Sequence, residues 1–171
     1  NKEGDRSLIN QIKSFSTVSQ MVEFSTMIST TKNKNNKTSF TRIKAVDQNY
    51  PLYGDVIYEP SGSLKNLNKI ENTIMVNENI FKNLKLKIND IVKVQNKEFK
   101  VIGIVKALPD IGGAFVFGDF ALTGKKTLDN LELNTLGSFL NYEYKIRFDS
   151  NENKDNIINK IINIFKDDNK V

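Results

Sequence analysis

The chain has 171 residues, enough for one domain or two small ones with a real hydrophobic core. It contains no Cys and no His, which excludes disulfides, thiol nucleophiles, zinc fingers and the imidazole base of hydrolase triads. The net charge is +5, but the lysines alternate with Asn, Asp and Glu along the whole chain, so this charge indicates a solvated surface rather than a nucleic-acid partner.

Membrane and targeting signals are absent from the sequence. No apolar run is long enough to span a bilayer, and residues 1–20 lack the apolar region of a signal peptide. Because the chain starts at Asn and its last helical pattern has no stop signal, we expect it to be a piece of a longer protein.

The first third of the chain predicts a helix followed by a long hairpin. Apolar residues at helical spacing predict a helix over residues 5–15, with Asp5 as its N-cap. A β-prone run covers residues 17–29, and an alternating strand covers residues 40–46. The polar segment 31–38 between them is the predicted turn of the hairpin.

The middle of the chain predicts short strands and one short helix. Strands are expected at residues 56–58 and 72–76, and a helix at residues 78–84. Residues 63–72 read as a polar connector without a predicted element.

A second hairpin follows at residues 91–102. Its apolar alternation predicts a two-residue loop at residues 96–97, with the asparagine taking a positive φ. This register places Val94 opposite Phe99 and Lys93 opposite Lys100.

The last third predicts a short strand at residues 120–122 and a short leucine-bearing helix capped by Thr127. A strand at residues 138–148 and an amphipathic helix at residues 151–167 complete the chain.

The order of these elements predicts an α+β fold. We expect residues 1–48 and 119–171 to form a discontinuous, porter-like sheet-and-helix subdomain. Residues 49–118 would then form a smaller β-rich subdomain inserted into it.

Paired carboxylates are one possible source of chemistry. Asp47, Asp55, Asp110 and Asp119 lie near turns or predicted strand ends, where two of them could hold a metal or act as acid and base. Aspartates also cap turns for local reasons, and we favour that interpretation.

The loop from Pro109 to Phe117 is the most glycine-dense segment. It has neither the lysine of a P-loop nor a dinucleotide fingerprint, so no nucleotide cofactor is expected. We interpret it as a hinge or an interaction surface, and its aromatic residues are either core or exposed contacts. The candidate residues are Pro109, Asp110, Gly112, Gly113, Phe115 and Phe117.

Three segments in order resemble one family. The first segment is Arg-Ile-Lys-Ala-Val-Asp-Gln-Asn-Tyr-Pro-Leu-Tyr-Gly at residues 42–54. The second combines the predicted strand and the start of the helix at residues 73–78 with the turn at residues 84–92. The third is Val-Ile-Gly-Ile-Val followed by the glycine loop, within residues 101–115. This set resembles the extracytoplasmic core domain of FtsX-like, MacB-like ABC transporter permeases, and within them the permeases associated with lysophospholipase or lipoprotein export. The family usually has Gly where this chain has Lys85 and Asn89, and Asn89 is the easier left-handed substitute.

The resemblance implies a non-catalytic domain without cofactor or metal, on the periplasmic face of the bacterial inner membrane. It implies as partners an ABC ATPase, reached through the rest of the permease, and a substrate or periplasmic protein. It also implies flanking transmembrane helices and allows a homodimer in the full transporter. The alternatives are a metal-dependent carboxylate enzyme and a basic nucleic-acid-binding module, which needs lysines gathered on one face with stacking aromatics.

Overall fold

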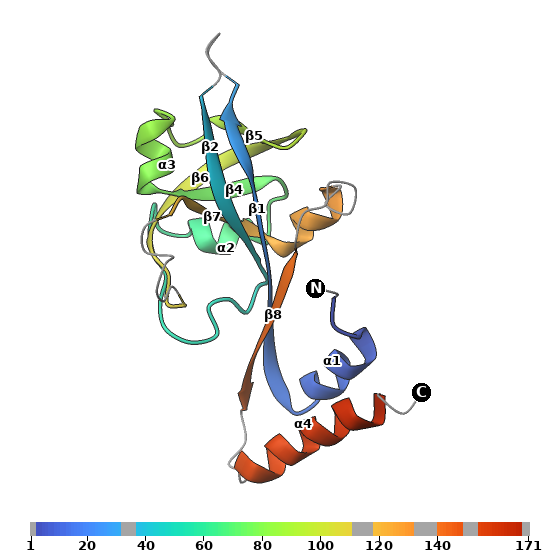
Figure 1. The fold of residues 1–171 in the computed structure, drawn as a ribbon. Helices are drawn as coiled ribbons and strands as arrows, with labels where there is room; N and C mark the ends of the chain where they lie inside the picture. The colour runs from blue at the N-terminus through green and yellow to red at the C-terminus, as the bar shows by residue number, and fades with distance from the viewer. Residues whose placement is uncertain (1–2, 32–36, 111–117, 132–139, 149–153, 169–171) are drawn as a thin grey trace.

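The computed structural model describes residues 3–31, 37–110, 118–131, 140–148 and 154–168. Figure 1 shows a β-rich body at one end and two helices at the other. The elements in chain order are α1 (Arg6–Lys13), β1 (Ser16–Thr30), β2 (Thr38–Val46), β3 (Ile57–Glu59), α2 (Ser63–Leu67), β4 (Thr73–Asn77), α3 (Glu78–Asn83), β5 (Ile91–Val94), β6 (Lys97–Ala107), β7 (Phe120–Gly124), the 3₁₀ helix η2 (Lys125–Asn130), β8 (Asn141–Phe148) and α4 (Lys154–Asp168).

Strand β1 is the longest strand and pairs with three others. Its first half pairs antiparallel with β8, from Ser16 opposite Phe148 to Glu23 opposite Asn141. Its second half pairs with β2, and its last residues also pair with β5. One continuous strand therefore belongs to both ends of the molecule (Figure 1).

The strands of the β-rich body close into a ring. Hydrogen-bonded neighbours run in the order β1, β2, β7, β4, β6, β5 and back to β1. The pairs β2–β7 and β4–β6 are parallel, and the other pairs of the ring are antiparallel. Closure leaves these strands without a free edge, which a barrel requires. The α+β prediction is confirmed.

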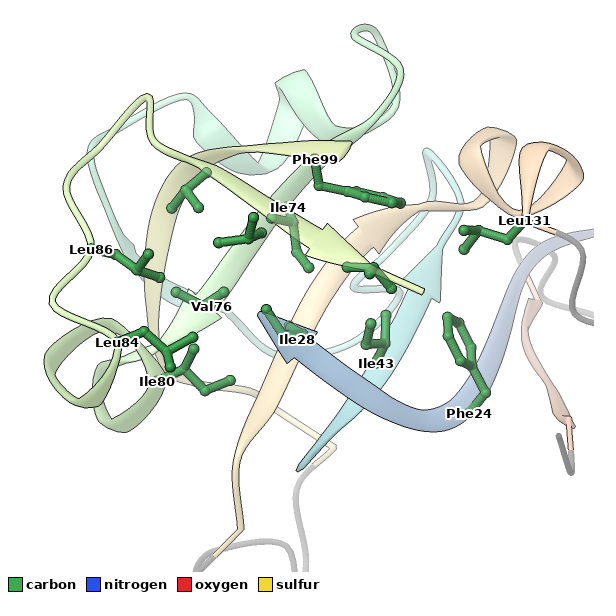
Figure 2. Packing of buried hydrophobic residues seen from close by; sticks show 14 residues of the cluster. Phe24, Ile28, Ile43, Ile74, Val76, Ile80, Leu84, Leu86, Phe99 and Leu131 are labelled. Carbon is green, nitrogen blue, oxygen red and sulfur yellow. The ribbon is translucent and has the colours of Figure 1, made fainter. Parts of the chain in front are cut away.

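The inside of the ring is the main hydrophobic core. Phe24 from β1 and Ile43 from β2 face Ile74 and Phe99 from the opposite strands (Figure 2). Helix α3 covers one end of this core with side chains that include the fully buried Ile80. Burial of such aliphatic side chains contributes about 2 kcal/mol each, so the ring interior is a main source of stability.

A second core lies under α2 and the segment between β2 and β3. Leu67 from α2 and Tyr50 from that segment join Met75 and Leu122 of the strands in one buried cluster. The backbone at Gly124 comes so close to α2 that a Cβ atom there would lie 2.0 Å from the Leu67 carbonyl oxygen. Only glycine fits this contact.

The end opposite the ring consists of α1, α4 and the paired halves of β1 and β8. Helices α1 and α4 contact each other, so the first and last helices lie together (Figure 1). Ile157 of α4 is buried, whereas Ile158 and Ile162 stay 40% and 41% exposed. No described helix is both long and apolar enough to cross a membrane.

Several local predictions are confirmed. Asp5 caps α1, because its Oδ1 accepts the backbone N–H groups of Ser7 at 2.6 Å and Leu8 at 3.3 Å. The long β-prone run forms β1. Lys85 and Asn89, which stand where the resembling family has glycine, both take a positive φ of 52° and 75°.

The predicted register of the second hairpin is wrong. Phe99 lies opposite Val92, and the two-residue loop is at residues 95–96, with Gln95 at a φ of 55°. The shift places Lys93 opposite Glu98 and so replaces a repulsive lysine pair with an opposite-charge pair. Because the shift is two residues, every side chain keeps its predicted face.

Two further predictions are wrong. The polar connector at residues 63–72 contains helix α2, whose short apolar stripe gave no helical period. Thr127 lies inside η2 rather than at its start, because that helix begins at Lys125 directly after β7.

The contact between Gly124 and α2 generates a stability prediction. We expect Gly124→Ala to lower the free energy of unfolding by about 2–3 kcal/mol, because the added methyl overlaps backbone that cannot move aside. Urea unfolding of the 171-residue chain measures it. Gly118→Ala is the matched control, since nothing lies within 4 Å of its added methyl. Equal stability of the two variants would contradict the contact.

Candidate functional site

The loop that follows β6 is the candidate site from sequence, and its first residues are held in place. Pro109 is exposed, but the carboxylate of Asp110 is only 8% exposed. The other predicted site residues, Gly112, Gly113, Phe115 and Phe117, lie outside the described residues. Whether the loop is a hinge or a contact surface therefore stays a prediction.

Asp110 binds three other parts of the chain at once. Its Oδ2 accepts from the ammonium of Lys44 at 2.6 Å and from that of Lys145 at 3.3 Å. Its Oδ1 accepts from the hydroxyl of Tyr50 at 2.8 Å. Lys44 belongs to β2 and Lys145 to β8, so this carboxylate connects the start of the loop to both ends of the molecule. We call this contact set the Asp110 anchor.

Lys44 is the buried cation of the anchor. Its side chain is 9% exposed and makes a second ion pair, with Glu23 Oε1 at 3.0 Å. Glu23 is its cross-strand partner on β1. The ammonium also lies 6.0 Å from the ring centroid of Tyr50, within reach of a cation–π contact. The cation thus has a complete set of partners, which a buried charge requires.

The anchor shifts the pKa values of its members in the directions that keep it charged. Burial opposes charge on Asp110, but hydrogen bonds from Lys44 and Tyr50 and the charge of Lys145 outweigh it and lower the carboxyl pKa. Burial likewise opposes charge on Lys44, but Asp110 and Glu23 outweigh it and raise the ammonium pKa. Burial, together with Asp110, raises the pKa of Tyr50, which stays a hydrogen-bond donor.

A glycine lets the segment after β2 pack against the loop. Gly54 has a φ of 69°, and a Cβ atom there would lie 2.6 Å from the Cβ of Pro109. Sequence inspection found Pro109 and Asp110 but missed Lys44, Glu23 and Tyr50 as their partners. Lys44 and Glu23 are oppositely charged residues on two strands whose neighbouring residues are mostly buried. This pattern in the sequence could have indicated that they form an ion pair.

Two of the other candidate aspartates, Asp47 and Asp119, have hydrogen-bond partners of their own, and Asp55 is exposed. Asp47 accepts from the Ser19 hydroxyl at 2.9 Å and from the backbone N–H groups of Gln20 at 2.8 Å and Asn49 at 3.0 Å. Asp119 accepts from a serine hydroxyl of β2. Within the described ranges, no three acidic side chains gather into a metal-binding group. These hydrogen bonds are those of carboxylates at turns and strand ends.

Solved structures with this fold come from transporters. The periplasmic region of MacB from Actinobacillus actinomycetemcomitans matches with a TM-score of 0.66 and 13% identity, over 98% of this chain and 75% of that one. The extracellular domain of the noncanonic ABC-type transporter YknZ from Gram-positive bacteria matches with a TM-score of 0.63 and 10% identity, over 97% and 84%. A search of curated proteins found no significant match.

The ring of strands, the paired end helices and these neighbours define the class: an extracytoplasmic domain of an ABC-type transporter permease. Within that class, the chain belongs to the family of MacB-like periplasmic core domains, whose model matches residues 2–164. The resemblance inferred from sequence is confirmed, and domains of this kind are generally non-enzymatic.

The anchor generates a stability prediction. We expect Asp110→Asn to lower the free energy of unfolding by about 2–3 kcal/mol, because the buried Lys44 loses its closest counterion. Urea unfolding measures the change. Asp55→Asn makes the same substitution at an exposed position and should change stability by less than about 0.5 kcal/mol. An unaffected Asp110 variant would show that the ion pair contributes nothing.

The lowered pKa of Asp110 also predicts a pH dependence. A carboxyl whose pKa is lower in the folded state stabilises the fold above its unfolded pKa of about 3.9, and loses this contribution as the pH falls through the folded value. The difference in unfolding free energy between the wild type and Asp110→Asn should therefore be constant near neutral pH and shrink below about pH 4. A difference that grows on acidification would contradict the assignment.

Proposed function

We propose that this domain is the non-catalytic part of a permease that carries motion from a cytoplasmic ATPase to a substrate or periplasmic partner. The observation that supports the proposal is β1, which runs without a break from the pair of end helices into the closed ring. A strand that is hydrogen-bonded along its whole length to β8 and then β2 transmits displacement without bending freely.

The position of the end helices fits membrane attachment. Helices α1 and α4 contact each other at the end away from the ring (Figure 1). In the proposed permease both continue toward flanking transmembrane helices, with the ring projecting into the periplasm from the inner membrane. The ATPase acts through those membrane helices, and a second permease copy completes a homodimer.

The proposal includes a division into two subdomains, whose strands join in the one closed ring. In this proposal residues 1–48 and 119–171 form the porter-like part, and residues 49–118 form the inserted β-rich part. The loop from Pro109 to Phe117 connects the two and serves as hinge or contact surface. The Asp110 anchor fixes the start of that loop against β2 and β8, so a displacement of either strand reaches the loop directly.

Spin-label distances in the full permease, reconstituted with its ATPase, test the coupling. The described chain has no Cys, so labels are introduced at two exposed positions, Lys97→Cys at the tip of the β5–β6 hairpin and Asn159→Cys on α4. We expect the distance from Lys97 to a lipid-headgroup label to change between the nucleotide-free and vanadate-trapped states. A constant distance between the two protein labels would assign the loop a contact role, because β1 then moves both ends as one body, whereas a changed distance would assign it a hinge role.

A catalytically inactive ATPase variant that cannot bind nucleotide is the control. It should abolish the change at Lys97 and leave the distance within the domain unaltered. A distance from Lys97 to the membrane that is the same in every nucleotide state would overturn the coupling proposal.

A further inference from the structure

A polar cavity separates α1 from the ring, on the side of the molecule where β2 ends. Its volume is about 430 Å³, and every residue that lines it carries a charged or an amide side chain. Ligand cavities are usually lined mostly by apolar groups, so this one is unsuited to a hydrophobic molecule. Four of its residues are cations: Arg6 and Lys13 from α1, and Lys125 and Lys126 from η2.

The two acidic residues of the cavity are already engaged. Asp47 accepts hydrogen bonds from a serine hydroxyl and from two backbone N–H groups. Glu3 lies 3.8 Å from the Lys125 ammonium and accepts from the Gln20 amide at 3.3 Å. The remaining cations, Arg6, Lys13 and Lys126, have no ion-pair partner among the residues that the structure describes. The cavity therefore carries an excess of positive charge.

The placement of Arg6 does not stabilise α1, whereas Lys13 lies in the last turn, where the helix dipole favours a cation. Arg6 is the first residue of α1, where the helix dipole disfavours a positive charge. Arg6 and Lys13 are two helical turns apart and so lie on one face of α1. Cations that converge on one cavity repel each other, and an anion between them removes this repulsion.

We propose that this cavity binds a phosphate-bearing anion. The planar guanidinium of Arg6 matches two phosphate oxygens, and Lys13 and Lys126 supply point charges around it. Gln48, Asn49 and Asn68 add amide donors to the same cavity. The phosphate group belongs either to a lipid headgroup or to a small phosphate compound, and both present the same chemistry to these residues.

Calorimetric titration of the 171-residue chain with pyrophosphate tests the site. We expect saturable one-to-one binding that weakens as salt rises. The double variant Arg6→Gln/Lys126→Gln should weaken it by about tenfold or more, because two charge-assisted contacts are lost. Both residues are exposed, and an unchanged urea midpoint confirms that the variant folds.

A matched control removes the same charge elsewhere. Lys97→Gln/Lys100→Gln lies on the β5–β6 hairpin and should change the affinity by less than about twofold. If both double variants bind pyrophosphate equally weakly, the loss reflects only the lower net charge of the protein, and the proposed site is overturned. Absence of binding to the wild type, or citrate binding as tightly as pyrophosphate, would overturn the phosphate assignment.

Vesicle flotation separates the two sources of phosphate. Recruitment to phosphatidic acid vesicles but not to phosphatidylcholine vesicles, lost in Arg6→Gln/Lys126→Gln and competed by pyrophosphate, assigns the site to a lipid headgroup. Pyrophosphate binding without recruitment to either vesicle assigns it to a small phosphate compound. Each of these results supports the anion site.

Discussion

The shared strand β1 is the constraint on which the rest of the structure depends. Its first half pairs with β8 and its second half with β2 and β5, so one continuous strand belongs both to the ring and to the end that carries α1 and α4. Because backbone hydrogen bonds are directional and buried ones must be satisfied, the pairing of β1 at both ends restrains their relative orientation. In the proposed function, force applied at the end helices reaches the ring through this hydrogen-bonded backbone.

The Asp110 anchor is a second connection between β1, β2 and β8, and it is made by ion pairs rather than by backbone hydrogen bonds. A buried ion pair adds little net stability compared with apolar packing, but it tolerates few alternative geometries. Lys44 has acidic partners on both sides, Glu23 and Asp110, and so fixes the position of the loop after β6 relative to β1 and β2. The loop thus begins at a defined point, which suits either a hinge or a contact surface.

Apolar and charged side chains are separated between the ring and the end that carries α1 and α4. Inside the ring, the cluster that includes Phe24, Ile74 and Phe99 is apolar, as a packed barrel core requires (Figure 2). The cavity beside α1 is lined only by charged and amide side chains, with cations in excess. Rigidity therefore comes from the ring, and the capacity to bind a charged group lies next to the end helices.

Much of the local structure was predictable because it depends on neighbours in sequence. The Asp5 cap and the long strand β1 follow from residue type and period. The left-handed turns at Lys85 and Asn89 were indicated by the resemblance to a family that usually has glycine at both positions. The α+β class and the family were also evident from the sequence. The register of the β5–β6 hairpin was not, since a two-residue slip leaves every face unchanged and only the pairing of Lys93 with Glu98 distinguishes the two arrangements.

What only the tertiary structure decided is which distant residues meet. Asp110 was a candidate in the sequence, but its partners Lys44 and Lys145 lie 66 and 35 positions away. Hydrophobic period determines which face of a strand is buried, but it carries no information on which strands become neighbours when the ring closes. The same reason explains why the cations of α1 and η2 looked like scattered surface charge in the sequence, whereas in the folded chain they line one cavity.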